Sequence, residues 1–213
     1  MRIVEPLQAN PSHITHPMSS RRQFLALCAL LNAGCGSAPL ATLATHDGAI
    51  SVQTWGGNST PAALTPQRIT HITVHHQGEL WDPESDVAAY LVRLQKWSRA
   101  TKGWIDIPYH YIIAPDGLIY AARPWEISGD TNTEYDPRGH LLVMLLGNFE
   151  IQYPTPKQWD STVGLIAQLL RRFGLDADQL GTHRDYSTQT VCPGAHLFER
   201  FLELKEAVKD RLN

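Results

Sequence analysis

The stretch LLVMLLGNF, residues 141–149, decides the fold of this protein. Its apolar residues follow one another without a polar position until Gly147. A half-buried strand would alternate apolar with polar residues, whereas a strand that is covered on both faces is apolar throughout. The stretch is also long enough to cross a sheet. It therefore predicts a central β-strand that is buried on both sides.

The sequence on either side of this strand predicts further strands and helices. RITHITVHH (68–76) alternates apolar and polar residues, as a strand does, and YHYIIAPDGLIYAARP (109–124) has two apolar runs around Pro-Asp-Gly, as a hairpin does. Apolar residues at helical spacing predict helices over 84–103, 155–174 and 196–211. Strands interleaved with helices indicate an α/β domain with a mixed sheet.

Two of these helices have a well-defined expected inner face. The helix over 84–103 is expected to turn one apolar face inward, formed by Val87, Tyr90, Leu91, Leu94 and Trp97. The last helix, over 196–211, is expected to bury Leu197, Phe201, Leu204 and Val208. Both predictions rest on the 3.6-residue period of an α-helix.

Composition limits the kinds of function that the chain can have. The 213 residues, 43% of them hydrophobic and 18% charged, suit one globular domain with an appendage. The formal net charge of −3 offers no electrostatic reason for a nucleic-acid partner. No apolar run reaches the roughly 18 residues that a membrane-spanning helix needs.

The N-terminal part has the layout of an export signal. In SSRRQFLALCALLNAGCGSA (19–38), the pair Arg21 and Arg22 precedes an apolar run and then small residues, as in twin-arginine signals. A short buried helix is the alternative interpretation. We therefore expect an N-terminal extension and signal over 1–35, a linker over 36–49 and a domain over 50–213. Met18 is a candidate start site, which would leave 1–17 upstream.

Export predicts a location in the periplasm or cell envelope. Cys35, in Leu-Asn-Ala-Gly-Cys, is a candidate lipid acceptor that would tether the protein to the membrane. Cleavage after a nearby small residue is the alternative. In either case Cys28 and Cys35 are not available to the domain, and Cys192 has no intradomain thiol to pair with. We therefore expect no structural disulfide.

Histidines and this isolated cysteine suggest a metal site. Neutral imidazole and thiolate are strong zinc ligands, and a catalytic zinc commonly has three protein ligands. His75 and His76 end a predicted strand and point to opposite faces, so only one of them can join such a site. His183 and Cys192 flank one loop. By spacing alone the signal for a metal site is moderate, and ordinary hydrogen-bonded histidines are the alternative; His110 is a candidate core residue or a support to the site.

Taken together, several motifs resemble the zinc-dependent N-acetylmuramoyl-L-alanine amidases, a family that includes the peptidoglycan recognition proteins. The similar stretches occur in the family's order over about 50–205: TWGG (54–57), ITVHHQG (72–78), DIPYHYIIAPDGLIYAARP (106–124), LLGNFE (145–150), PTPKQW (154–159) and GTHRDYSTQTVCPG (181–194). The resemblance implies a single domain with a central mixed sheet flanked by helices. It also implies one Zn²⁺ per chain, held in a groove by His75, His183 and Cys192.

The resemblance also assigns roles to other residues. It implies that Tyr109 and Thr190 are catalytic hydroxyl donors beside the metal. Two features depart from the family's pattern: the loop between His183 and Cys192 is one residue longer, and 141–147 lacks the glutamate that some relatives carry.

The resemblance implies a reaction and a substrate. The reaction is hydrolysis of the amide between the lactyl group of N-acetylmuramic acid and L-alanine, in peptidoglycan or muropeptides, by a monomer. Trp104 and His76 are candidate substrate contacts, with a strand-face hydrogen bond as the alternative for His76. The alternative function is a non-catalytic module that binds muropeptides. Because the resemblance implies that such modules lack the zinc cysteine, Cys192 favours catalysis.

Overall fold

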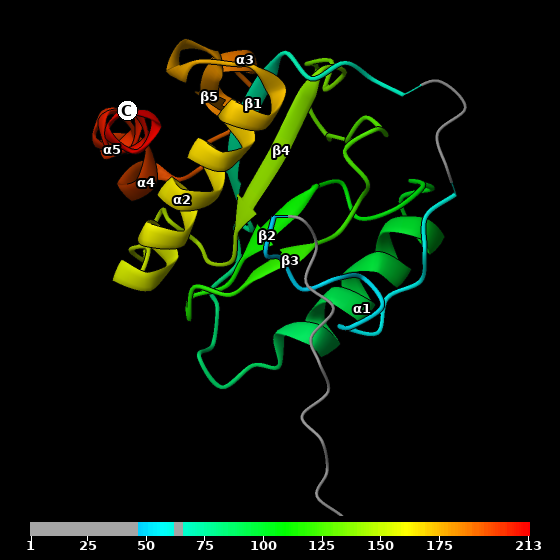
Figure 1. Cartoon of the computed structure of the whole chain (residues 1–213). Helices are drawn as coiled ribbons and strands as arrows, with labels where there is room; N and C mark the ends of the chain where they lie inside the picture. Colours follow the sequence, from blue (N-terminus) through cyan, green and yellow to red (C-terminus); the bar gives the residue numbers. More distant parts are fainter. Residues whose placement is uncertain (1–46, 62–65) are drawn as a thin grey trace, which may run out of the picture. The chain divides into compact units, whose positions relative to one another are not determined.

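A mixed five-stranded sheet organises the computed structural model, which describes residues 47–61 and 66–213 (Figure 1). The predicted export signal and Cys35 lie outside these residues. The strand order is β3-β2-β4-β1-β5, and only the β2–β3 pairing is antiparallel. The strands are β1 (His71–His76), β2 (Tyr111–Ile113), β3 (Ile119–Ala121), β4 (His140–Leu145) and β5 (Leu180–Thr182).

The apolar stretch that opened the sequence analysis forms the central strand. All six residues of β4 are buried, and β4 pairs in parallel with β2 on one side and β1 on the other. Val143 and Leu145 belong to one hydrophobic core, while Met144 and Leu146 belong to a second core. The predicted central strand, buried on both faces, is therefore confirmed.

Helices cover both faces of the sheet (Figure 1). α1 (Val87–Ala100) packs over one core, and α2 (Pro156–Phe173) and α5 (Phe201–Leu212) pack over the other. The shorter helices are η1 (Ala177–Gln179), α3 (His183–Tyr186) and α4 (Ala195–Glu199). Among the described residues, no helix combines the length and apolar character required to cross a membrane. The predicted α/β architecture is confirmed.

Helix α2 begins and ends where its sequence predicts. The Thr155 hydroxyl accepts a hydrogen bond from the Gln158 backbone N–H at 3.1 Å, and Pro156 follows in the first turn, where its missing N–H costs nothing. Gly174 ends the helix in the left-handed conformation, with φ of 64°. The helix therefore spans the region that the sequence predicts.

The expected inner face of α1 is only partly correct. Leu91 is fully buried, but Trp97 is 44% exposed, and the buried positions of the helix also include the polar residues Gln95 and Ser98. Tyr90, Leu94 and Trp97 instead line a groove beside the helix. Spacing shows that these residues share a face, but it does not distinguish a core from the wall of a groove.

The predicted last helix is two helices in the structure. α4 ends at Glu199 and α5 begins at Phe201, with Arg200 outside helical geometry between them. The Arg200 guanidinium lies 3.9 Å from the centroid of the Trp159 ring on α2. The break allows both parts to pack against one core, because Leu197, Phe201, Leu204 and Val208 are all buried as predicted.

The domain begins earlier than the sequence suggests. Residues 47–49 belong to the predicted linker, yet Ala49 is fully buried and Asp47 is nearly so. Asp47 forms an ion pair with Arg172 at 2.8 Å and accepts a hydrogen bond from the Tyr111 hydroxyl. Contacts with partners so distant along the chain cannot be predicted from the local sequence.

Candidate metal centre

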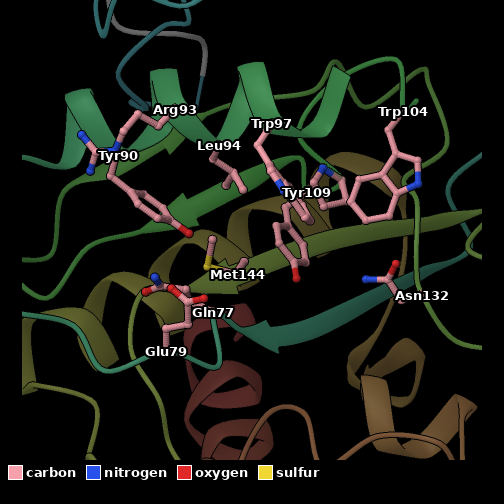
Figure 2. A pocket seen from close by; sticks show the side chains of 11 residues that line it. Gln77, Glu79, Tyr90, Arg93, Leu94, Trp97, Trp104, Tyr109, Asn132 and Met144 are labelled. Atoms are coloured by element: carbon pink, nitrogen blue, oxygen red, sulfur yellow. The ribbon is translucent and has the colours of Figure 1, made fainter. Parts of the chain in front are cut away.

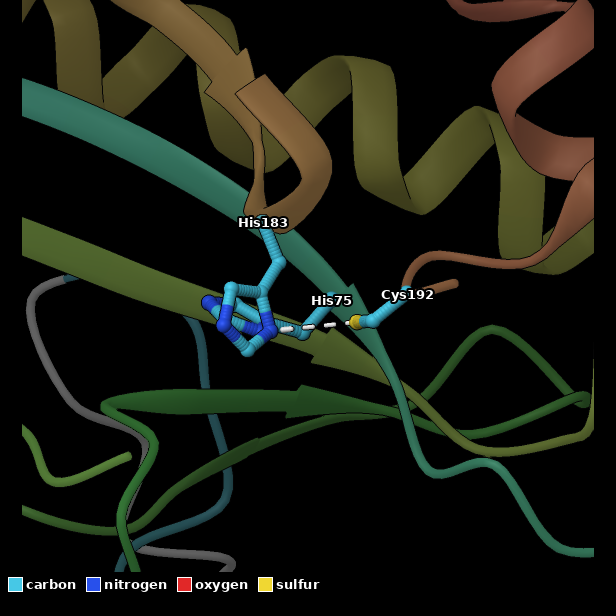
Figure 3. Close-up of side chains that lie close together, drawn as sticks. All are labelled: His75, His183 and Cys192. Atoms are coloured by element: carbon cyan, nitrogen blue, oxygen red, sulfur yellow. Dashed lines mark hydrogen bonds between the residues drawn. The ribbon is translucent and has the colours of Figure 1, made fainter. Parts of the chain in front are cut away.

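Three side chains from separate parts of the chain converge at one end of the sheet (Figure 3). Candidate ligand atoms of His75, His183 and Cys192 all lie within 4.8 Å of one another, and all three residues are buried. The Cys192 Sγ lies 3.6 Å from His75 Nδ1, and the two imidazole rings are 4.7 Å apart. The structure thus brings together the three residues predicted to bind metal.

The end of β1 gives its two histidines opposite surroundings. His75 points toward His183 and Cys192, whereas the His76 ring points to the other face and accepts a hydrogen bond from the Phe149 N–H at 3.2 Å. The backbone N–H of His76 donates to the Cys192 sulfur at 3.4 Å. His76 is buried, and this hydrogen bond agrees with the strand-face alternative, while its substrate contact stays a prediction.

Backbone hydrogen bonds close the loop that carries Cys192. The Arg184 N–H donates to the Cys192 carbonyl at 3.1 Å, and the Arg184 guanidinium donates to the Val191 carbonyl at 2.8 Å. The Thr190 hydroxyl accepts from the Cys192 N–H at 3.0 Å. Thr190 therefore helps to position the cysteine backbone, and its predicted catalytic role stays a prediction.

A glycine brings this loop against the turn that follows β4. Gly194 has φ of 90°, and a Cβ added there would lie 2.4 Å from the Phe149 carbonyl carbon. Only glycine fits here, because it adopts a positive φ easily and has no Cβ to clash with the Phe149 backbone. Two residues later, the His196 N–H donates to the Phe149 carbonyl at 2.9 Å. The Cys192 loop is thus anchored on both sides of the cysteine.

The two histidines have the protonation state that a metal ion requires, whereas the cysteine must lose a proton to bind one. Burial lowers the pKa of His75 well below its ordinary value, with a further contribution from His183, and burial also lowers the pKa of His183. Both imidazoles are therefore neutral at pH 7, as a ligand must be. Burial raises the pKa of the Cys192 thiol to about 12, so in the metal-free site the sulfur carries a proton.

The donor set fits a borderline-soft divalent cation. Two imidazoles and one thiolate match the ligands found at catalytic zinc sites, which keep a fourth position open. In addition, His75 Nε2 is buried and has no hydrogen-bond partner within residues 47–61 and 66–213. A buried polar atom without a partner is expected where something other than the polypeptide completes the site.

A groove of about 400 Å³, whose lining side chains are shown in Figure 2, lies next to the candidate metal centre. Tyr109 and Met144 connect the two, because both line the groove, Met144 is paired in register with His75, and the Tyr109 ring lies 5.2 Å from the His75 ring. Further lining residues are Gln77, Glu79, Tyr90, Arg93, Leu94, Trp97, Trp104, Pro108 and Asn132. The groove is therefore rich in aromatic side chains, with a few polar groups among them.

Trp104, a predicted substrate contact, lies in the wall of this groove. It lines the groove and packs edge-to-face against Trp97, with ring centroids 6.1 Å apart. The Lys102 ammonium lies 5.1 Å from the centroid of the Trp104 ring. These neighbours hold an aromatic surface at the groove wall.

Tyr109 is held next to the metal centre by the segment around it. The buried Arg123 guanidinium donates to the carbonyls of Asp106 and Ile107, at 2.7 and 2.8 Å, and the Arg123 N–H donates to the Tyr109 carbonyl at 3.1 Å. Burial raises the pKa of Tyr109 above its ordinary value. Its hydroxyl is therefore a hydrogen-bond donor at neutral pH.

His110 has a structural role. Its Nδ1 accepts from the Leu142 N–H at 2.8 Å, and its Nε2 bonds to the Ile127 carbonyl at 2.9 Å. Both ring nitrogens are thus used to join neighbouring backbone segments. The interpretation of His110 as a core residue is confirmed.

Three residues beside the metal centre carry no signal in the sequence. Thr133 hydrogen-bonds to His183, Glu134 accepts hydrogen bonds from the loop that follows His183, and the Tyr135 ring lies 5.1 Å from the His183 ring. Local sequence marks this polar stretch only as a loop between two strands. Its contacts arise from residues about 50 positions away.

Comparison with known proteins adds an independent observation. The family model described as N-acetylmuramoyl-L-alanine amidase matches residues 65–195. Peptidoglycan-recognition protein SC2 of Drosophila melanogaster is 26% identical over 152 residues, which cover 70% of this chain and 82% of that protein.

Solved structures share the fold. N-acetylmuramoyl-L-alanine amidase LysC from Clostridium intestinale URNW superimposes with a TM-score of 0.56 and 28% identity, over 71% of this chain and 94% of that chain. A mutant of Drosophila PGRP-LB in complex with tracheal cytotoxin gives a TM-score of 0.59 and 25% identity, over 71% and 90% of the two chains.

Proposed function

This chain belongs to the N-acetylmuramoyl-L-alanine amidase family, and we propose that it is an active, zinc-dependent member. The proposed reaction is hydrolysis of the amide that joins the lactyl group of N-acetylmuramic acid to L-alanine in bacterial peptidoglycan. The convergence of His75, His183 and Cys192 is the observation that carries this proposal. A protein that only binds peptidoglycan has no need for three buried metal ligands beside its groove.

The proposed mechanism assigns one task to each residue of the centre. His75 and His183 are neutral donors, and Cys192 is the anionic donor that a zinc ion requires. When bound, zinc supplies a Lewis acid that polarises the scissile carbonyl and lowers the pKa of a coordinated water. Because two imidazoles and one thiolate leave a dipositive ion with excess positive charge, the centre suits an anionic transition state.

Two hydroxyls are proposed to act on the substrate. Tyr109 keeps its proton at neutral pH and donates a hydrogen bond from Oη to the oxyanion that develops on the scissile carbonyl. It also passes its proton to the departing L-alanine amine and takes one from the attacking water, so the hydroxyl is protonated again at the end. Thr190 is proposed as the second donor, since a hydroxyl that accepts from the Cys192 N–H still has its own hydrogen to donate.

The groove is proposed to hold the substrate next to the metal centre. Relatives support a peptidoglycan ligand, because the Drosophila PGRP-LB structure contains tracheal cytotoxin, a monomeric diaminopimelic acid-type peptidoglycan. Trp104 is proposed to pack against the bound muropeptide, and the protein is proposed to act as a monomer.

Digestion of purified peptidoglycan tests the proposed function. Mass spectrometry of the products is expected to show free stem peptides that begin with L-alanine, together with glycan that has lost its peptides. A zinc chelator is expected to suppress these products, and added Zn²⁺ to restore them. Binding to peptidoglycan without any such products would instead support the non-catalytic binding module.

Zinc uptake by the metal-free protein is expected to release about one proton from its protein ligands at pH 7. The proton comes from Cys192, whose thiol pKa of about 12 keeps it protonated, while both histidines are already neutral. The apparent zinc affinity should therefore rise about tenfold per pH unit near neutrality. Calorimetry in buffers of different ionisation enthalpy measures the proton count, and a count near zero would contradict these protonation states.

Export is proposed on the basis of the sequence alone. The twin arginines Arg21 and Arg22 precede an apolar run, and we propose that this signal directs the domain to the periplasm or cell envelope. Peptidoglycan lies in that compartment, so the location agrees with the proposed substrate. Cys35 remains the proposed site of a lipid tether.

A further inference from the structure

The segment formed by residues 131–134, between β3 and β4, reaches the metal centre from outside its ligand set. Thr133 Oγ1 lies 2.8 Å from His183 Nε2, although the two residues are 50 positions apart. Thr131 Oγ1 lies 2.8 Å from Thr133 Oγ1 and 3.5 Å from His183 Nε2. Two threonine hydroxyls therefore lie within hydrogen-bond distance of one nitrogen of a predicted metal ligand.

This contact determines which nitrogen of His183 is available. With Nε2 hydrogen-bonded to Thr133, Nδ1 is the nitrogen left for a metal ion. A neutral imidazole that binds through Nδ1 carries its proton on Nε2, which then donates to Thr133 Oγ1. The Thr133 hydroxyl can in turn donate to Thr131 Oγ1. The chain of hydroxyls thus favours one tautomer of His183.

The same segment also holds the loop that carries Cys192. The Glu134 carboxylate accepts hydrogen bonds from Ser187 Oγ at 2.6 Å and from the Thr188 N–H at 3.1 Å. Both partners lie between His183 and Cys192. The hydrogen bond from Ser187, followed by weaker ones, lowers the pKa of Glu134, so the carboxylate is charged at neutral pH.

We propose that Thr133 and Glu134 are positioning residues of the zinc centre, an inference that rests on the proposed function. Thr133 orients the His183 imidazole and selects Nδ1 as its ligand atom. Glu134 fixes the course of the loop between His183 and Cys192. Outer groups that hydrogen-bond to metal-binding histidines act in this way, and their loss typically weakens metal binding about 10–100-fold.

Zinc affinity measured by chelator competition tests the role of Thr133. Thr133→Val keeps the size of the side chain and removes the hydroxyl, so we expect the zinc dissociation constant to rise about 10–100-fold. Thr133→Ser keeps a hydroxyl at this position, so its zinc affinity should stay close to that of the unaltered protein. Thr162→Val is the matched control, because Thr162 is a buried threonine whose hydroxyl bonds to the Gln158 carbonyl within α2.

Cobalt substitution separates positioning from general stability. The visible absorption of the Co²⁺-loaded protein reports the ligand geometry, and we expect it to change in Thr133→Val but not in Thr162→Val. Glu134→Ala should also weaken zinc binding, but by less than Thr133→Val, because Glu134 bonds to the loop and not to a ligand. Glu84→Ala, which also removes an exposed glutamate, should leave zinc binding unchanged.

The outcomes distinguish this inference from the proposed function. If the unaltered protein binds zinc tightly but Thr133→Val and Glu134→Ala bind it within about twofold of the same affinity, far below the effect expected, the positioning roles are wrong and the proposed function stands. If the unaltered protein does not bind zinc, the proposed function and this inference are both wrong.

Discussion

Replacing Cys192 with serine is expected to abolish zinc retention and peptidoglycan cleavage together. Serine preserves the size of the side chain, but its hydroxyl is not an anionic ligand at neutral pH, so the centre loses the donor that balances the metal charge. A catalytic metal contributes several kcal/mol to the rate, which corresponds to about 10³-fold or more. Metal content by mass spectrometry and amide cleavage by muropeptide analysis should fall in parallel.

The fold is expected to survive this substitution. The cysteine loop is also held by the Arg184 backbone, the Arg184 guanidinium and the close contact at Gly194, none of which needs the thiol. Circular dichroism of the metal-free proteins should therefore agree. Cys35→Ser is the matched control and should keep full activity in the purified protein. Undiminished cleavage by Cys192→Ser would refute the zinc mechanism.

Replacing Tyr109 with phenylalanine is expected to lower kcat by about 10²–10³-fold, the usual effect of losing one oxyanion donor. The ring and its packing against His75 remain, so zinc affinity should not change. KM should also change little, because the hydrogen bond forms mainly in the transition state. Steady-state kinetics on a defined muropeptide, with metal content measured on the same samples, separate these effects.

Tyr120→Phe is the matched control for this experiment. Tyr120 is a buried tyrosine on β3 and packs in the core beneath α1. Its substitution should leave kcat close to that of the unaltered protein. A Tyr109→Phe variant with normal kcat would show that the proton and the oxyanion are handled by another group, and Thr190 would be the first candidate.

The sequence by itself determined the central features of this protein. The apolar stretch 141–149 predicts β4 because only a strand covered on both faces lacks a polar side. Helix α2 is marked by a capping threonine, a first-turn proline and a left-handed glycine. Residue type and the family's motifs predict His75, His183 and Cys192 as metal ligands, because imidazole and thiolate are strong zinc ligands.

Only the tertiary structure decided where the other side chains lie. Helical spacing shows that Tyr90, Leu94 and Trp97 share a face, but the neighbouring strands and loops make that face a groove wall. Asp47 is buried because Arg172, far along the chain, pairs with it.

The contacts around the candidate metal ligands were likewise decided by the tertiary structure. Thr133 meets His183 because folding places the loop between β3 and β4 beside the end of β5. The local sequence predicts whether a segment is a helix or a strand and where it ends, because short-range sterics and capping decide both. Contacts between distant segments depend on how those elements pack, and packing exists only in the folded chain.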